Sequence, residues 1–431
     1  MTKRWLATFW LIAIMLPWQA QALIIEITGG TESALPIAIV PFGSEGFSAP
    51  EDISAVIQND LSRSGRFAPL PLSDLISSPH EKSEINFKDW RLLRSEGLLV
   101  GKISSADGET YQVQFQLFDV YKGQQLVGKR YQVPASGLRR LAHQIADQVY
   151  QALTGEIGVF STRLAFVSVI NQADGNKRYT LQVSDSDGAN PRTVLQSKQP
   201  ILSPNWAPDG ERLAYVSFEN GKAEVFIQEM RSGRRNSVAA FKGLNSAPSW
   251  SPDGKKLALT LSKAGNPEIY ILELASGKLS RVTHNSQAID TEAVWMPNGR
   301  ELLFTSDRGG RPQIYKVSVD GGRAKRVTFE GRYNASPDIS IDGRTLTMVH
   351  GLNGHFYIAV QDLETGAVLV LTELGRDESP SFAPNGRMIL YATEKKGHGE
   401  LAAVSVDGRI HQRLGESGRD VREPAWSPIR K

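Results

Sequence analysis

Short apolar runs separated by polar, Gly-containing turns fill the last two thirds of the chain. The runs are rich in Val, Ile, Leu, Tyr and Phe, as in Arg212 to Ser217, and they are bounded by Asp-Gly, Asn-Gly or Ser-Gly pairs. This composition is typical of short β-strands joined by tight turns rather than of helices. The region is therefore predicted to be all-β.

The strand pattern repeats with a nearly fixed period. The motif Pro-Ser-Trp-Ser-Pro-Asp-Gly at 248–254 recurs in variant forms, and the lead positions of its copies are 206, 250, 295, 339, 382 and 426. Each period has room for four strands of about 5–6 residues. Four-stranded units with such a period are the blades of β-propellers, so six copies predict six blades. The motif residues themselves are interpreted as packing and turn residues.

The two ends of the repeat region complement each other. Arg163 to Ser168 resembles the second strand of a blade with no motif before it, whereas Trp426 to Pro428 resembles a first strand with no second strand after it. Pairing between them would complete one blade and leave no open sheet edge. The prediction is a six-bladed propeller over residues 158–431 that is closed by pairing of the C-terminal strand with the first blade.

Residues 35–157 show a different pattern. A strand-like apolar run at 35–42 is followed by helical stripes at 49–64 and 138–153, with further strand-like runs between them. Mixed strands and helices over about 120 residues predict one small α/β domain in front of the propeller.

The chain begins with the features of a secretory signal peptide. Lys3 and Arg4 precede an apolar run from Trp5 to Trp18, and Ala20-Gln21-Ala22 has the small residues of a cleavage site. Residues 1–22 are therefore predicted to be removed. The chain has no Cys that could carry a lipid, so an exported protein without a direct membrane anchor is expected.

Residues 23–34 begin with a short β-type segment that has two interpretations. It is an edge strand of the following domain, or it is a mobile arm that adds as a strand to a partner's sheet. The segment consists of Leu23, Ile24, Ile25, Glu26, Ile27 and Thr28.

The net charge and the motifs of the chain give little indication of a nucleic-acid-binding, catalytic or metal-binding site. The net charge is +3, which offers no basis for nucleic-acid binding. No Gly-x-Ser-x-Gly or His-Glu-x-x-His motif is present, and the seven His show no metal-ligand spacing. Asp185 to Gly188 starts like a calcium loop but lacks the later ligands, so it is interpreted as a turn. We therefore expect no catalytic residue, no bound metal and no cofactor.

The segments before each motif run toward the central channel and form its predicted rim. Their mixture of apolar and polar side chains on a rigid ring suits a protein or peptide ligand. An exported propeller enzyme that uses rim carboxylates, or a propeller that binds small molecules, stays open as an alternative. The candidate rim residues are Leu202, Leu244, Asn245, Ala247, Asp290, Thr291, Glu292, Tyr333, Asp377 and Glu378.

Taken together, the signal peptide, the short first strand, the run Pro36 to Phe42 and the six copies of the Trp-Ser-Pro-Asp-Gly motif and its variants resemble the TolB family. The stretch Thr305 to Tyr315 strengthens this resemblance, which covers essentially the whole chain. It implies a monomeric, non-enzymatic adaptor in the periplasm of Gram-negative bacteria that supports outer-membrane constriction during division.

The resemblance also implies partners for two regions. The propeller mouth would bind the peptidoglycan-associated lipoprotein Pal through Leu202, Leu244, Ala247 and Thr291, and bacteriocin translocation segments would use the same mouth. The segment Leu23 to Thr28 would bind TolA. Leu244 departs from the family pattern, in which His is common at this position.

Overall fold

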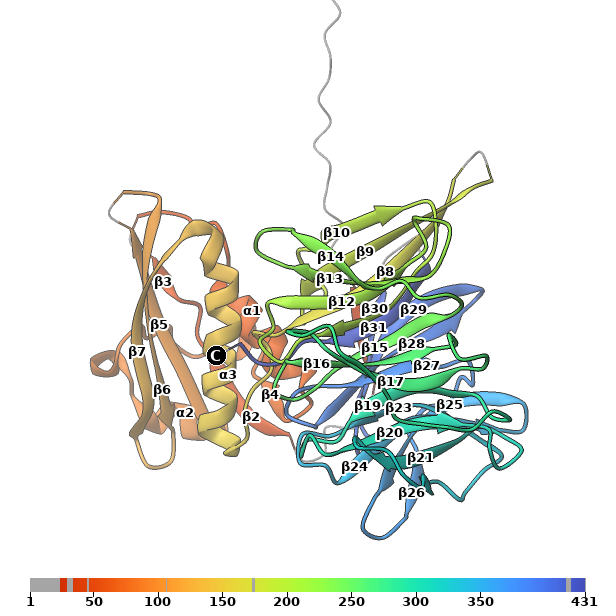
Figure 1. Ribbon diagram of the computed structural model, residues 1–431. Coiled ribbons are helices and arrows are strands. Elements are labelled where there is room, and N and C mark those ends of the chain that lie inside the picture. The colour runs from red at the N-terminus through yellow and green to blue at the C-terminus, as the bar shows by residue number, and fades with distance from the viewer. Residues whose placement is uncertain are drawn as a thin grey trace, which may run out of the picture.

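The computed structural model describes residues 24–28, 34–44, 46–105, 107–172, 175–415 and 420–430. An α/β domain lies beside a β-propeller, as the two-part pattern of the sequence predicts (Figure 1). The predicted signal peptide, residues 1–22, and Leu23 lie outside the described residues. Within the described part of the chain, no helix is long and apolar enough to cross a membrane.

The α/β domain is built on a mixed sheet with the strand order β4-β2-β5-β6-β7. Strand β2 is parallel to β4 and β5, β3 pairs in parallel with β5, and the pairs β5–β6 and β6–β7 are antiparallel. The elements in chain order are β2 (Leu35–Ile39), β3 (Gly43–Ser44), α1 (Ile53–Arg63), β4 (Phe67–Pro69), η1 (Leu72–Asp74), η2 (Lys82–Glu84), α2 (Phe87–Leu92), β5 (Gly97–Ser105), β6 (Thr110–Asp119), β7 (Gln124–Pro134), η3 (Ala135–Gly137) and α3 (Leu138–Thr154).

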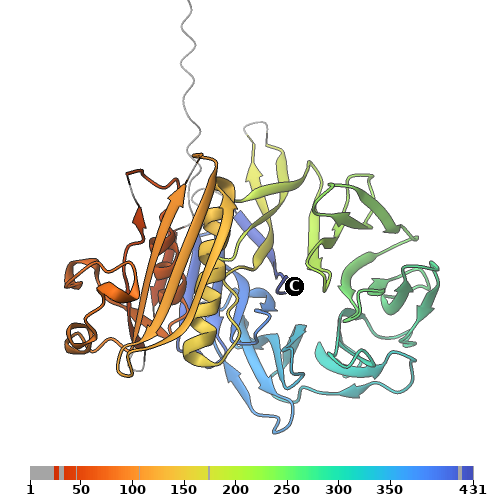
Figure 2. The same ribbon diagram turned by 90° about the vertical axis from the view of Figure 1, so that its left-hand side faces the viewer.

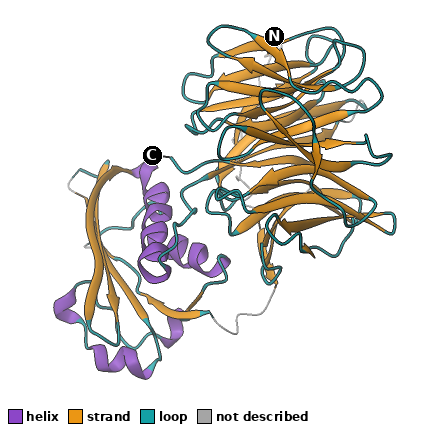
Figure 3. Cartoon of the chain, turned by 60° about the horizontal axis from the view of Figure 1, so that its bottom comes forward, coloured by secondary structure: helices purple, strands orange, loops and turns teal. Residues whose placement is uncertain are grey.

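Helices α1 and α3 cover one face of this sheet and lie between it and the propeller (Figure 3). Helix α1 begins after Asp52, whose carboxylate accepts a hydrogen bond from the backbone N–H of Ala55. Helix α3 ends at Gly155, which has the left-handed conformation that favours glycine at a helix C-terminus. The apolar stripes of both helices pack on the sheet, so their polar sides are free to meet the propeller.

The propeller has six antiparallel four-stranded blades arranged around a central channel (Figure 2), as the six motif copies predict. Apolar clusters lie between neighbouring blades. Blades 1 to 3 consist of β31 (Asp420–Trp426), β8 (Arg163–Asn171), β9 (Lys177–Asp185) and β10 (Arg192–Ser197); β11 (Ile201–Trp206), β12 (Arg212–Ser217), β13 (Glu224–Glu229) and β14 (Arg235–Ala239); and β15 (Asn245–Trp250), β16 (Lys256–Leu261), β17 (Glu268–Glu273) and β18 (Leu279–Arg281).

Blades 4 to 6 follow in the same order. They consist of β19 (Asp290–Trp295), β20 (Glu301–Ser306), β21 (Gln313–Ser318) and β22 (Lys325–Arg326); β23 (Tyr333–Ile339), β24 (Thr345–Leu352), β25 (His355–Asp362) and β26 (Val368–Val370); and β27 (Glu378–Phe382), β28 (Met388–Lys395), β29 (His398–Ser405) and β30 (His411–Gly415).

The ring closes as predicted. The last strand, β31, pairs antiparallel with β8, so that Trp426 lies opposite Leu164 and Asp420 lies opposite Val169. The chain therefore contributes the innermost strand of blade 1 from its C-terminal end, which joins the first and last repeats without an open edge.

The Trp of the repeated motif connects neighbouring blades. The indole N–H of Trp250 donates to the backbone carbonyl of Asn205 in the preceding blade at 3.2 Å, and Trp295 does the same to Ser249 at 3.1 Å. In the turn that follows, Gly254 has φ 68°, a conformation that a side chain would strain. These contacts support the interpretation of the motif as structural.

The N-terminal segment takes a position that neither interpretation of the sequence specifies. Strand β1 (Ile24–Thr28) pairs antiparallel with β30, with Ile24 opposite Gly415 and Thr28 opposite His411. It is the outermost strand of blade 6 and not part of the α/β sheet. The prediction of an edge strand in the following domain is therefore wrong, because the free edge of blade 6 supplies the partner.

Candidate functional site

The innermost strand of each blade starts at the same mouth of the channel and is interrupted by a bulge. In blade 3, for example, the pairing of β15 with β16 shifts register between Ser246 and Ser249. One residue with positive φ lies in each bulge, which is uncommon for residues other than glycine and re-aims the side chain. These residues are Ser203, Ala247, Glu292, Ser336, Ser379 and Glu423, with φ between 47° and 55°.

Two of these six positions carry carboxylates that connect neighbouring blades. Glu292 accepts hydrogen bonds from the backbone N–H and the hydroxyl of Ser336, both at 3.0 Å. Glu423 accepts a hydrogen bond from the backbone N–H of Ser203, also at 3.0 Å. Burial, together with the nearby charges of Glu378 and Glu292, raises the pKa of Glu423 to about 7. The inner ring is therefore polar, acidic and held by hydrogen bonds between blades.

Seven of the predicted rim residues are at least partly accessible at this mouth. Leu244 is 37% exposed, and its backbone N–H donates to Ser262 Oγ at 2.7 Å. Tyr333 packs edge-on against Phe356 with ring centroids 5.0 Å apart. The accessible residues are Leu202, Leu244, Ala247, Thr291, Glu292, Tyr333 and Glu378.

The other three predicted rim residues are buried, and each has a partner inside the protein. Asn245 is fully buried, accepts from the backbone N–H of Phe241 and donates to its carbonyl, so it holds the loop that presents Leu244. Asp290 is fully buried and pairs with Arg308 at 2.7 Å. Asp377, which is 2% exposed, accepts from the Thr372 hydroxyl. These side chains shape the rim but cannot reach a partner directly.

The same geometry weakens the case for rim carboxylates as acid–base catalysts. Asp290 and Glu292 both lie on strand β19 of blade 4, Asp377 lies just before strand β27 of blade 6, and each is occupied by a separate hydrogen-bond partner. General acid–base work needs a carboxyl within reach of the reacting proton. Asp290 and Asp377 are buried, so of these three carboxylates only Glu292 is accessible at the mouth.

The sequence interpretation missed accessible residues next to the rim. Phe329 is 72% exposed and Phe356 is 42% exposed, and neither was named as a candidate. Glu423 was missed as well. The spacing within the repeats could have identified it, because Glu423 lies three residues before Trp426 just as Glu292 lies three residues before Trp295.

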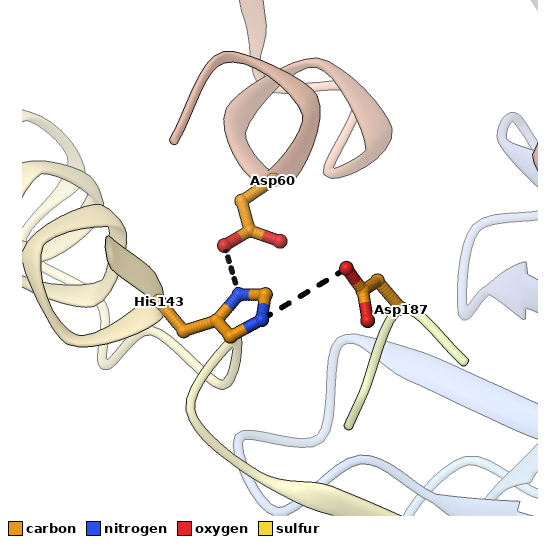
Figure 4. A group of neighbouring side chains, drawn as sticks. All are labelled: Asp60, His143 and Asp187. Atoms are coloured by element: carbon orange, nitrogen blue, oxygen red, sulfur yellow. Dashed lines mark hydrogen bonds and ion pairs between the residues drawn. The ribbon is translucent and has the colours of Figure 1, made fainter. Parts of the chain in front are cut away.

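A second polar cluster lies between the two domains (Figure 4). Asp60 of α1, His143 of α3 and Asp187 of the turn between β9 and β10 come together, and His143 is only 2% exposed. His143 Nδ1 donates to Asp60 Oδ2 at 2.5 Å, and His143 Nε2 lies 3.8 Å from Asp187 Oδ2. The predicted turn at Asp185 to Gly188 is thus confirmed as a turn, but its contact with the other domain was not predicted.

This donor set does not suit a metal ion. The guanidinium of Arg139 lies 2.5 Å from Asp187 Oδ2, and that of Arg63 lies 3.1 Å from Asp60 Oδ1. Both carboxylates therefore already have cationic partners, and an added divalent cation would be repelled by two guanidinium groups. The cluster is better described as a buried network of ion pairs.

Comparisons with known proteins agree with this architecture. A family model described as the TolB beta propeller domain matches residues 150–430, and one described as the TolB amino-terminal domain matches residues 23–126. The Tol-Pal system protein TolB of Nitrosococcus oceani is 61% identical over 432 residues, which cover 99% of each chain. The protein of the same name from Xanthomonas campestris pv. campestris is 48% identical over 435 residues, which cover 99% of this chain and 98% of the relative.

A solved structure is similar over nearly the whole molecule. The crystal structure of TolB from Acinetobacter baumannii superposes with a TM-score of 0.87 at 43% sequence identity, and the match covers 94% of this chain and 100% of that one. The α/β domain, the six blades and their arrangement are therefore shared with a solved protein.

Proposed function

Because the chain belongs to the TolB family, a component of the Tol-Pal system, we propose that it is a non-enzymatic periplasmic adaptor with two separate partner sites. The propeller mouth binds Pal, and the N-terminal segment binds TolA. One observation carries the proposal: accessible rim residues from several blades gather at one mouth, while β1 lies apart from them on the outer edge of blade 6.

The mouth has the properties of a protein-binding surface. Leu244 and Thr291 are accessible on a rigid ring, and their strands are fixed by pairing on one side and by contacts between blades on the other. A rigid surface loses little conformational entropy when it binds, which favours affinity. The mixed apolar and acidic character suits a folded partner with an apolar, partly basic face.

The N-terminal segment suits recognition by strand addition. Strand β1 is joined to the propeller through backbone pairing with β30 alone among the described strands. A segment that already pairs as an edge strand can pair with the sheet of another protein by the same hydrogen bonds. Binding to TolA would then exchange one strand partner for another.

Calorimetric titration of the mature protein with the soluble domain of Pal tests the mouth. Replacing Leu244 by Ala removes an accessible apolar side chain, and we expect the dissociation constant to rise roughly 5- to 30-fold, which corresponds to about 1–2 kcal/mol. Ile341, which is 70% exposed in the turn that follows the motif strand of blade 5, provides the matched control Ile341→Ala. Equal losses in both variants, or no binding by the unaltered protein, would refute the assignment of the mouth.

A second pair of variants enlarges a side chain instead of shortening one. Thr291→Ile adds bulk at the mouth, whereas Thr345→Ile makes the same change at a half-buried strand residue at the other end of the ring. We expect only the first to weaken Pal binding. Deletion of residues 24–28 should abolish TolA binding and leave the interaction with Pal measurable, and unchanged TolA binding would exclude the segment as its site.

A further inference from the structure

The interface between the two domains contains a buried histidine that touches both of them. His143 projects from α3, Asp60 from α1 of the same domain, and Asp187 from the first blade of the propeller. All three side chains are largely buried, with exposures of 2%, 1% and 8% for His143, Asp60 and Asp187. A change in the charge of this histidine is therefore poorly screened by solvent.

Charged groups from every neighbouring element face this histidine. Helix α1 contributes Asp60 and Arg63, and the segment before it contributes Glu51, which pairs with Arg139 at 3.0 Å. Helix α3 adds Arg139 and Asp147, and Asp147 accepts from the backbone N–H of Phe160 at 2.6 Å. The propeller turn adds Asp185, 3.7 Å from Arg139, and Asp187. The carboxylates of Asp60 and Asp187 flank the ring itself, so a positive charge on His143 is favoured.

The two ring nitrogens of His143 have different partners. Nδ1 donates to Asp60 within the same domain, and a neutral ring can keep this hydrogen bond. Nε2 faces Asp187 across the domain interface at 3.8 Å and has no hydrogen-bond partner, although it is buried. Loss of the proton from Nε2 would leave a lone pair facing a carboxylate, so deprotonation affects the contact that joins the domains and spares the one within the α/β domain.

We propose that His143 is a proton-dependent contact between the α/β domain and the propeller. With the proton, its ring lies between the carboxylates of Asp60 and Asp187 and attracts both. Without it, Nε2 repels Asp187, while the guanidinium groups of Arg63 and Arg139 still hold the propeller turn to the α/β domain. The proposal concerns the relative position of the domains and does not depend on the identity of the partners.

The electrostatic setting supports this direction of response. Burial alone would lower the pKa of His143, but the charges of Asp60 and Asp187 outweigh it and raise the pKa above its ordinary value of 6.5. A histidine whose pKa is higher in the docked state contributes to docking below the undocked pKa, and it loses this contribution as the pH rises through the docked pKa. The docked form should therefore be favoured in mild acid and weakened in mild base.

As the pH rises, the two domains should become less tightly held together but should not separate. Arg63 donates to Ser186 Oγ at 2.6 Å, Arg387 pairs with Glu156 at 2.5 Å and Gln412 donates to the carbonyl of Arg63, and none of these contacts depends on His143. Each unit of difference between the docked and undocked pKa changes the ratio of docked to undocked molecules about tenfold.

Distance measurement between spin labels on the two domains tests the proposal. The chain has no cysteine, so Lys129→Cys and Lys278→Cys provide single labelling sites at exposed positions of the α/β domain and of blade 3. The distribution of label distances is recorded from about pH 5.5 to about pH 9, a range that spans the titration of histidine. We expect one narrow distribution in acid that broadens as the pH rises.

Two variants and one control test whether the change in the distance distribution with pH is caused by the proton on His143. In His143→Gln, the distribution should be broad at every pH, and in Asp187→Asn the dependence on pH should disappear although His143 remains. His350→Gln is the matched control, since His350 is 5% exposed within the propeller and burial lowers its pKa. This control should respond to pH as the unaltered protein does.

The proposal is overturned if the unaltered protein shows the same distribution across the pH range, or if His143→Gln keeps the response. A distribution that follows added zinc or a chelator instead of pH would also overturn it. Should His143→Gln fail to fold, the pKa of His143 can be read from its imidazole NMR signals in the unaltered protein. A value at or below about 6.5 would then contradict the proposal.

Discussion

Replacing Trp250 by Phe tests whether the repeated Trp connects the blades. The indole N–H of Trp250 donates to the carbonyl of Asn205 in the preceding blade at 3.2 Å, and the guanidinium of Arg212 lies 4.5 Å from the ring centroid. Phenylalanine fits this position, because blade 6 carries Phe382 at the equivalent place. The substitution therefore removes one hydrogen bond and part of the ring system without requiring a change in backbone conformation.

The expected loss can be estimated from these contacts. A hydrogen bond contributes about 0.5–1.5 kcal/mol, and a carbonyl left without its partner in a buried site adds a further penalty. The smaller ring loses apolar contact and weakens the interaction with Arg212 by roughly another 1 kcal/mol. We expect the free energy of unfolding of the propeller to fall by about 2–3 kcal/mol.

The chain offers a control for the loss of ring size. Trp90 is fully buried in the α/β domain, but its indole N–H has no hydrogen-bond partner, so Trp90→Phe removes the same atoms without breaking a hydrogen bond. Hydrogen exchange read by mass spectrometry gives the free energy of opening for each domain separately. If Trp250→Phe destabilises its domain no more than Trp90→Phe does, the indole does not connect the blades as described.

Three further substitutions test the electrostatics. Burial raises the pKa of Glu423 to about 7, so between about pH 4.5 and about pH 7 the folded state holds a proton that the unfolded state has already lost, and the stability of the protein falls as the pH rises through this range. Glu423→Gln should remove this fall and stabilise the protein by roughly 2–3 kcal/mol near pH 8. Chemical unfolding at several pH values measures both effects. Arg63→Ala should cost about 3–5 kcal/mol in thermal or chemical unfolding, because it leaves the buried carboxylate of Asp60 without its guanidinium partner. Arg387→Ala should cost at most about 1 kcal/mol in the same assay, because its ion pair is exposed, and a larger loss would contradict this reasoning.

The propeller could be predicted because its information is local and repeated. Each motif specifies one turn and one inner strand, and a period of 43 to 45 residues fixes how many blades the ring must hold. The closure of the ring followed from the same logic, since an unmatched first strand at Trp426 and an unmatched second strand at Arg163 have no other partner.

The position of β1 could not be predicted in the same way. A five-residue apolar segment can pair with any free edge of suitable length, and its partner β30 is almost 400 residues away in the sequence. The domain interface was missed for a related reason. Asp60, His143 and Asp187 lie far apart in the chain and share no spacing, so only the packing of α1 and α3 against blade 1 brings them together.

The rim was only partly predicted, because a loop sequence does not reveal which way each side chain points. The alternation of a strand places neighbouring residues on opposite sides, and the bulges at the mouth shift this alternation. Asn245 and Asp290 therefore point inward to hold their loops, while Leu244 and Thr291 remain accessible.

The most direct test of the two-site account is a hydrogen-exchange map of the mature protein with and without the soluble domain of Pal. The account predicts that the amides around Leu244 and Thr291 become protected at the mouth, with no direct footprint on the turns that follow the motif strands at the other end of the ring. Protection confined to those turns, or to the outer strands of the blades, would contradict the assignment of the mouth as the site for Pal.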